Sequence, residues 1–174
     1  MAVGIGYDAH RLVAGRRLVL GGVEFEADRG LLGHSDADVA THAVMDALLG
    51  AAALGDIGQH FPPSDPRYAD ASSIGLLQQV AQMLQRDNWR VGNVDVTIVA
   101  EWPRIAPRIE EMRREIGEAI GIASTRVSIK ATTNEGLGFI GRGEGIAAIA
   151  IAEIVRSDPS VIDLASSTRS GRRG

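Results

Sequence analysis

The stretch Val3-Gly4-Ile5-Gly6-Tyr7-Asp8-Ala9-His10 alternates along its length as a β-strand does. Its apolar side chains would point one way, and Asp8 and His10 the other. Two ligand-type side chains spaced two residues apart on one strand face lie close enough to share an ion. This stretch therefore predicts a first strand and, on it, part of a metal site.

A helix that begins near Ser35 is the second informative feature. Ser35 has the character of a helix N-cap, and Asp38 three residues later completes an acidic version of the capping box. The Ala- and Leu-rich stretch that follows predicts a helix over residues 36–54. On that helix Asp38, His42 and Asp46 are spaced at i, i+4 and i+8 and share a face, so either carboxylate could orient the His42 ring.

Asp8, His10 and His42 together form a candidate three-ligand zinc site. Three protein ligands leave one coordination position open, which is typical of catalytic rather than structural zinc. The chain has no cysteine, so any zinc must use histidine and carboxylate. The alternative is that Asp8 and His10 are solvated strand residues and that His42 is a buried or capped helix histidine.

The composition indicates a single globular, soluble domain. The chain has 174 residues, 45% of them apolar, and no apolar run near the ~20 residues that cross a membrane. The net charge of −4 and the absence of a basic stripe exclude nucleic acid as an expected partner. With no cysteine and no signal-like segment before the first strand, we expect a cytoplasmic protein with no membrane partner.

The remaining elements predict an α+β fold, with helices packed on one face of a single sheet. We expect one domain over residues 1–156 and a polar, disordered tail over residues 157–174. Short strands flank the Gly21-Gly22 turn. The later elements are a helix over 72–87, a strand over 91–100, a helix ending near Ile120, and strands over 126–131 and 145–155.

A glycine-rich segment, residues 136–141, matches the pattern G-x-G-x-x-G after a strand. The glycines that continue through residues 142–145 make a poor helix start, and no P-loop lysine is present, which disfavours a dinucleotide site. We interpret the glycines as permitting a close approach of backbones, for which a subunit contact is one place. The preceding residues, 130–135, offer hydroxyls, an ammonium and a carboxylate, which suit phosphate and a hard cation such as magnesium.

In combination these motifs resemble the family of 2-C-methyl-D-erythritol 2,4-cyclodiphosphate synthases, enzymes of the non-mevalonate isoprenoid pathway. The similarity runs in order from residue 3 to about residue 155. The matching strings lie at residues 6–10, 33–38, 42–50, 54–58, 92–97, 130–133 and 141–145.

The resemblance implies a homotrimer whose sheets surround the three-fold axis and whose active sites lie between neighbouring subunits. Asp8, His10 and His42 match the family's zinc ligands. Glu135 matches the carboxylate that binds magnesium or manganese beside the nucleotide's phosphates.

The resemblance also assigns substrate and channel positions. His34, Asp56 and Thr133 match residues that act directly on the reacting phosphates. The substrate-binding positions are His34, Ser35, Asp56, Ile57, Gly58, Phe61, Ala100, Pro103, Arg104, Ile105, Ala106, Lys130, Ala131, Thr132 and Thr133. Phe139, Arg142 and Glu144 match residues of a central channel that can hold an isoprenoid diphosphate.

The implied activity is that of a phosphorus–oxygen lyase. In 4-diphosphocytidyl-2-C-methyl-D-erythritol 2-phosphate, the 2-phosphate attacks the β-phosphorus, closing a cyclic diphosphate and releasing CMP. Because the nucleophile is already an anion, positioning and charge neutralisation would supply most of the catalysis.

Three positions depart from the family pattern: Arg104 replaces a lysine, Gly136 a lysine and Asn134 a threonine. Two rival functions stay open at this point. One is a zinc-dependent phosphoester hydrolase with Asp38 or Asp46 as general base. The other is a non-enzymatic trimeric module that binds isoprenoid diphosphates through Arg142.

Overall fold

The structure, a computed structural model, describes residues 1–157. Most of the predicted tail, residues 158–174, lies outside the described residues. The elements are β1 (Ala2–Ala14), β2 (Leu18–Leu20), β3 (Val23–Phe25), β4 (Arg29–Leu31), α1 (Val39–Ala51), α2 (Ile57–His60), η1 (Pro66–Tyr68), α3 (Ser73–Arg86), β5 (Trp89–Val99), η2 (Ala106–Arg108), α4 (Ile109–Ile120), η3 (Ser124–Arg126), β6 (Val127–Thr132), α5 (Gly138–Gly141) and β7 (Gly145–Arg156).

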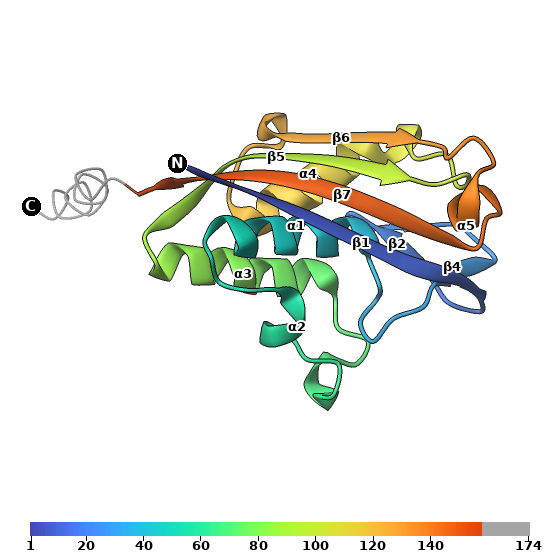
Figure 1. Ribbon diagram of the computed structural model, residues 1–174, viewed down its shortest axis with the longest axis horizontal. Helices are drawn as coiled ribbons and strands as arrows, with labels where there is room; N and C mark the ends of the chain where they lie inside the picture. Colours follow the sequence, from blue (N-terminus) through green and yellow to red (C-terminus); the bar gives the residue numbers. More distant parts are fainter. Residues whose placement is uncertain (158–174) are drawn as a thin grey trace, which may run out of the picture.

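One mixed sheet organises the molecule, with strand order β4-β1-β7-β5-β6. The pairs β4–β1, β1–β7 and β7–β5 are antiparallel, and β5–β6 is parallel. Figure 1 shows α1, α3 and α4 together on one side of this sheet, which confirms the predicted α+β layer with helices on one face. Within residues 1–157, no helix is long and apolar enough to cross a membrane.

Glycines on β1 let α1 pack unusually close to the sheet. A Cβ atom added at Gly6 would lie 2.0 Å from the carbonyl oxygen of Ala43, and one at Gly4 would lie 2.1 Å from that of Ala47. Only a residue without a side chain permits such an approach. Asp8 lies further along the same face of β1, so its carboxylate points toward α1.

The other face of β1 and β7 is apolar and exposed. Val3, Ile5 and Tyr7 are 63%, 69% and 58% exposed. In the sheet register Ile5 pairs with Ile151, and Tyr7 pairs with Ile149. The alternation predicted for β1 is therefore confirmed, and its apolar side faces away from the helices. Exposed apolar surfaces are typical of interaction sites.

The start of α1 differs from the prediction. Asp38, not Ser35, is the N-cap, and its carboxylate accepts hydrogen bonds from the N–H groups of Ala40 and Thr41. Ala37 has a left-handed backbone, with φ 57°, so the helix cannot extend back to residue 36. The helix ends at Ala51, before Ala53, which also has a positive φ.

Asp38 also connects α1 to the β2–β3 hairpin. Its two carboxylate oxygens accept from the N–H groups of Gly21, at 2.8 Å, and Gly22, at 2.7 Å. Both glycines have positive φ values, which the tight turn requires. Asp38 is therefore a structural residue that joins the hairpin to the helix.

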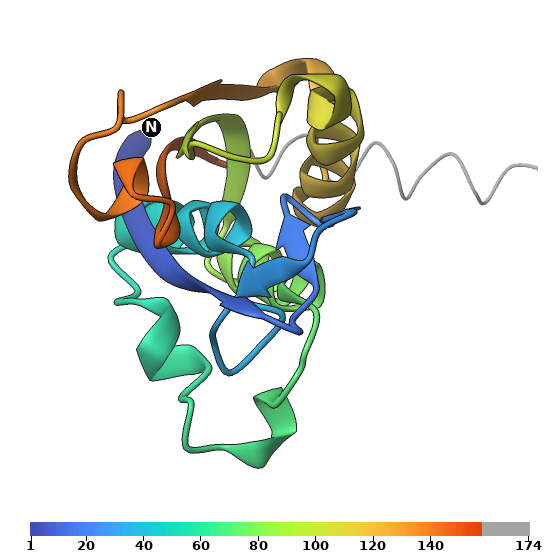
Figure 2. The ribbon, with the colours of Figure 1, turned by 90° about the vertical axis from the view of Figure 1, so that its right-hand side faces the viewer.

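The glycine segment that precedes β7 is a loop that ends in the four-residue helix α5. A Cβ added at Gly141 would lie 2.0 Å from the carbonyl carbon of Gly136. This contact confirms the interpretation of the glycines as a close backbone approach. Figure 2, turned to view the molecule from this end, shows α2 and η1 projecting beyond α1 and α3 on the helix side of the sheet.

Candidate metal centre and active site

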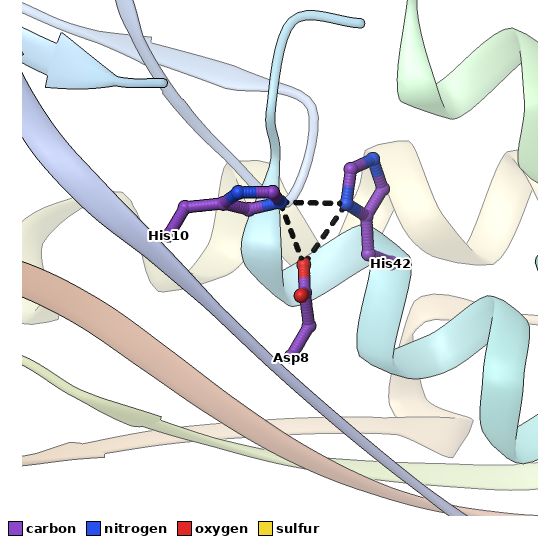
Figure 3. A group of neighbouring side chains, drawn as sticks. All are labelled: Asp8, His10 and His42. Atoms are coloured by element: carbon purple, nitrogen blue, oxygen red, sulfur yellow. Dashed lines mark hydrogen bonds and ion pairs between the residues drawn. The ribbon is translucent and has the colours of Figure 1, made fainter. Parts of the chain in front are cut away.

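Asp8, His10 and His42 converge on one point, as Figure 3 shows. Oδ2 of Asp8 lies 2.9 Å from Nε2 of His10 and 2.9 Å from Nδ1 of His42. The two ring nitrogens are 3.2 Å apart. Asp8 and His10 come from β1 and His42 from the first turn of α1. Asp8 and His10 are therefore not separate solvated strand residues, because both contact His42 and each other.

The three ligand atoms fit a tetrahedral zinc ion. With bonds of about 2.0–2.2 Å, the ligand atoms of such a site are separated by roughly 3.3 Å. The measured separations, 2.9 to 3.2 Å, are close to that spacing. Within the described residues this is the one group of three metal-type side chains that meets, and Glu135 is not part of it.

Charge coupling within the triad sets its pKa values. Burial alone would raise the pKa of Asp8, but hydrogen bonds from His10 and His42 lower it well below its usual range. For His42, burial lowers the pKa, but the hydrogen bond to Asp8 and the negative charges of the nearby aspartates together outweigh burial, so the net direction is upward. Without metal, therefore, the triad favours an ionised carboxylate beside a protonated His42 ring.

This coupling predicts how bound zinc would change the stability of the protein at different pH values. Because the His42 pKa is raised on folding, its contribution to metal-free stability is complete below about pH 6.5 and is lost as pH rises through the raised value. Zinc must displace this proton, so its affinity rises over the same range. Added zinc should therefore raise the melting temperature more at about pH 8 than at about pH 6. Thermal unfolding with and without zinc measures this, and a zinc effect independent of pH would contradict it.

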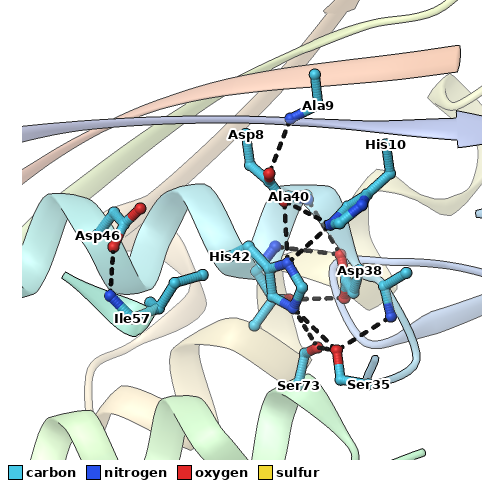
Figure 4. Close-up of polar contacts among 12 residues, drawn as sticks. Asp8, Ala9, His10, Ser35, Asp38, Ala40, His42, Asp46, Ile57 and Ser73 are labelled. Atoms are coloured by element: carbon cyan, nitrogen blue, oxygen red, sulfur yellow. Dashed lines mark hydrogen bonds and ion pairs between the residues drawn. The ribbon is translucent and has the colours of Figure 1, made fainter. Parts of the chain in front are cut away.

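The partners of His42 on its other side differ from the prediction. Nε2 of His42 lies 3.1 Å from Oγ of Ser35 and 3.0 Å from Oγ of Ser73. Figure 4 shows both serines beside the ring. Asp38 is occupied by backbone N–H groups and by the Thr41 hydroxyl. Asp46 accepts from the N–H of Ile57 at 2.8 Å. The prediction that Asp38 or Asp46 orients the His42 ring is therefore wrong, because both carboxylates hold backbone elsewhere.

A cavity of about 230 Å³ opens beside the triad. It brings together most of the residues predicted for the phosphate and erythritol part of a substrate. They are His34, Ser35, Ile57, Gly58 and Phe61, joined by Met45, Pro63, Tyr68 and Leu76. Asp56 is the N-cap of α2, where its carboxylate accepts from the backbone and side-chain nitrogens of Gln59. Those hydrogen bonds lower the pKa of this carboxyl.

A second cavity, of about 200 Å³, holds most of the other predicted substrate positions. Its lining consists of Ala100, Glu101, Pro103, Arg104, Ile105, Ala106, Ala131, Thr132 and Thr133. Lys130 is not in this lining; its ammonium pairs with the Asp95 carboxylate across the β5–β6 ladder. In one chain, the two halves of the predicted substrate site are therefore separate cavities.

The predicted channel residues lie near a third cavity, of about 500 Å³, at the start of β7. Arg142 donates to Glu144 at 2.7 Å, and Arg11 and Arg29 line the same cavity. Phe139 is partly exposed beside Gly145. The molecule therefore presents three guanidinium groups and an aromatic ring close to this cavity.

Three polar residues of the site were not predicted from the sequence. Ser73 and Asp36 contact each other beside His42, and Glu101 holds the loop that carries Glu135. Ser73 is 31 residues from His42, so no local spacing indicates their contact. Glu101 lies within residues 100–106, the loop that the resemblance assigns to the cytidine pocket, but its contact with the loop that carries Glu135 was not predicted.

The chain belongs to the YgbB family, whose sequence model matches residues 1–155. The relatives in this family include 2-C-methyl-D-erythritol 2,4-cyclodiphosphate synthases. The one from Syntrophomonas wolfei is 63% identical over 154 residues, which cover 88% of this chain and 98% of that protein. The bifunctional enzyme IspD/IspF of Anaeromyxobacter dehalogenans is 60% identical over 157 residues, and the chain spans 40% of its length.

Solved structures show the same fold. The bifunctional IspDF from Campylobacter jejuni superposes with a TM-score of 0.87 at 36% identity, covering 90% of this chain and 42% of that one. IspF from Plasmodium falciparum in complex with CDP has a TM-score of 0.79 at 29% identity, covering 90% and 97% of the two chains. The similarity includes proteins of nearly this length and larger bifunctional proteins.

Proposed function

We propose that this chain converts 4-diphosphocytidyl-2-C-methyl-D-erythritol 2-phosphate to 2-C-methyl-D-erythritol 2,4-cyclodiphosphate and CMP, as a phosphorus–oxygen lyase. The observation that carries the proposal is the Asp8–His10–His42 triad at the mouth of a cavity lined by His34 and Ser35. Relatives that carry the name of this synthase are matched over nearly their whole length.

The groups around the triad support a reaction without a general base. Asp8 is the only carboxylate among the described residues that line the first cavity, and it is paired with two histidines. Asp38 and Asp46, the bases that a hydrolase would need, are bound to backbone N–H groups instead. The hydrolase alternative therefore has no support. The substrate's own phosphate anion serves as nucleophile.

Asp8, His10 and His42 would hold Zn²⁺, which withdraws negative charge from a bound phosphate when present. His34 and Ser35, on the adjacent loop, orient the diphosphate. That loop is itself held by Arg16, which donates to the carbonyls of Gly33 at 3.3 Å and Ser35 at 2.8 Å. A rigid loop supports catalysis here, because positioning supplies much of the rate.

Thr133 and Glu135 would act on the nucleotide side. The Thr133 hydroxyl donates to Oε1 of Glu135 at 3.0 Å, so the two side chains lie together at the end of β6. Glu135 is proposed to bind Mg²⁺ or Mn²⁺, whose preferred ligands are oxygens. The adjoining cavity, lined by Ala100, Arg104 and Thr132, would take the cytidine and its phosphates.

A homotrimer would join the two half-sites. The exposed apolar face around Ile5, Tyr7 and Ile151 supports subunit contact through the sheets. Such an assembly would set the second cavity of one subunit against the metal centre of its neighbour. It would also gather three copies of Arg142, beside Phe139, into an axial site for an isoprenoid diphosphate. The absence of cysteine fits the cytoplasm as its location.

Phosphorus NMR of the purified protein with the cytidyl diphosphate substrate, zinc and magnesium tests the proposed reaction. The expected products are a cyclic diphosphate and CMP, both absent with the His42→Ala variant. A linear product that carries two separate phosphate groups, formed together with CMP, would contradict the proposed cyclisation.

Mixing two inactive variants tests the shared site. His42→Ala damages the metal half, and Thr133→Ala damages the nucleotide half. When subunits are mixed and allowed to exchange, some interfaces pair two intact halves, so part of the activity should return. Activity that stays at the level of the separate variants, despite proven subunit exchange, would contradict a site shared between subunits.

Glu101 provides a separate prediction for the second metal. Its Oε1 accepts from the N–H groups of Asn134, at 2.9 Å, and Gly136, at 3.3 Å, and so fixes Glu135 between them. Glu101→Ala should raise the magnesium concentration for half-maximal activity by about 10-fold and leave zinc affinity unchanged. Glu101→Gln retains an oxygen acceptor and should stay near wild type. A magnesium titration of the three proteins measures this, and equal values would contradict the assigned role.

A further inference from the structure

Ser73, the first residue of α3, lies against the metal triad without belonging to it. Its side chain is fully buried, and its Oγ lies 3.0 Å from Nε2 of His42 (Figure 4). On the other side, the Ser73 hydroxyl donates to Oδ1 of Asp36. The Ser73 backbone N–H donates to Oδ2 of the same carboxylate at 2.9 Å. Ser73 thus connects a carboxylate to the nitrogen of His42 that faces away from Asp8.

The protons in this arrangement can be assigned one by one. An ionised carboxylate only accepts hydrogen bonds, so the hydroxyl proton of Ser73 is committed to Asp36. Oγ of Ser73 can then only accept from His42, which places a proton on Nε2. The proton that a metal displaces is therefore the one on Nδ1, the atom that faces Asp8 and His10, and its loss leaves a lone pair there for the metal. Histidines that bind metals commonly have the second ring nitrogen fixed in this way.

Ser35 approaches the same nitrogen but is held differently. Its Oγ lies 3.1 Å from Nε2 of His42 and accepts from the N–H of Ala37 at 3.2 Å. No carboxylate takes its hydroxyl proton among the described contacts. Ser35 also lines the cavity, so this proton can turn toward a substrate. Of the two serines, only Ser73 has a fixed direction.

We propose that Ser73, held by Asp36, is a positioning residue that keeps His42 in the Nε2-protonated form able to bind metal through Nδ1. This inference rests on the metal centre of the proposed function and extends its support to α3. It also gives Asp36 a role, as the group that fixes the direction of the Ser73 hydroxyl.

Zinc affinity, measured by competition with a chelator and without substrate, tests the proposal. Ser73→Ala should bind zinc about 10- to 100-fold more weakly than wild type. Ser72→Ala is the matched control: Ser72 is the N-cap of the same helix, and its Oγ accepts from the N–H of Gly75. This control weakens α3 without touching His42 and should keep wild-type affinity.

Asp36→Asn is a second variant that retains the shape of the carboxylate. Its amide can donate to Ser73, which allows the serine hydroxyl to turn and donate to His42 instead. Zinc affinity should again fall. In zinc-loaded protein with ¹⁵N-labelled histidine, the Nε2 proton of His42 should exchange slowly with water in wild type and faster in Ser73→Ala.

Wild-type affinity and proton exchange in Ser73→Ala would overturn the proposal, and so would an equal loss of affinity in Ser72→Ala. If the wild-type protein bound no zinc, the metal centre of the proposed function would be contradicted instead. The two failures are therefore distinguishable.

Discussion

Replacing His42 with alanine is expected to abolish stoichiometric zinc binding and to lower turnover by at least about 10³-fold. The substitution removes one of three ligand atoms that lie within 4.8 Å of one another. A bound metal contributes several kcal/mol of charge stabilisation to phosphate chemistry, and about 4 kcal/mol corresponds to this factor. Zinc content per chain and steady-state turnover measure the two effects.

His60 supplies the control for this experiment. It lies in α2, where its Nε2 contacts the carbonyl oxygen of Leu54 at 2.8 Å, away from the triad. His60→Ala should keep one zinc per chain. A His42→Ala protein that retained both its zinc and most of its turnover would remove the triad from the mechanism.

Replacing Gly6 with alanine is expected to destabilise the protein by about 3 kcal/mol or more and to weaken zinc binding. The added Cβ would lie 2.0 Å from the carbonyl oxygen of Ala43 and 2.7 Å from the backbone nitrogen of Ala47. Neither contact can be relieved by rotating a side chain, so the cost should reach the upper end of the range for overpacking. Because α1 must move away from β1, His42 also moves away from Asp8.

Gly50 provides a matched glycine on the same helix. A Cβ at Gly50 would meet nothing within 4 Å, so Gly50→Ala should stabilise the protein by about 0.5–1 kcal/mol through helix propensity. Thermal unfolding compares the two variants; Gly6→Ala should lower the melting temperature by about 6–12 °C. An unchanged melting temperature for Gly6→Ala would contradict the packing that we assign to β1 and α1.

Local patterns predicted the elements that depend on local physics. The alternation over residues 3–10, the helix over residues 72–87 and the strand over residues 145–155 all appear as expected. The triad was also predictable, because two of its ligands lie on one strand face. The start of α1 was not, because the left-handed Ala37 and the hairpin contacts of Asp38 depend on tertiary structure.

The contacts of the His42 ring also could not be predicted from local sequence patterns. Spacing along α1 favoured Asp38 and Asp46, yet the contacts come from Ser35 and Ser73, which are brought in by a loop and another helix. A helical face identifies which residues are neighbours on one helix but not which elements pack against it. The separation of the two substrate cavities likewise depends on the fold of the whole chain.

Isotope labelling tests the central claim, intramolecular cyclisation at the Asp8–His10–His42 centre, most directly. The protein would be supplied with zinc, magnesium and the cytidyl diphosphate substrate in ¹⁸O-labelled water, and the products analysed by mass spectrometry. Because the substrate's own phosphate attacks, we predict a cyclic diphosphate and CMP that contain no ¹⁸O. Incorporation of one ¹⁸O atom into a phosphate product per turnover would show attack by water and would contradict the account.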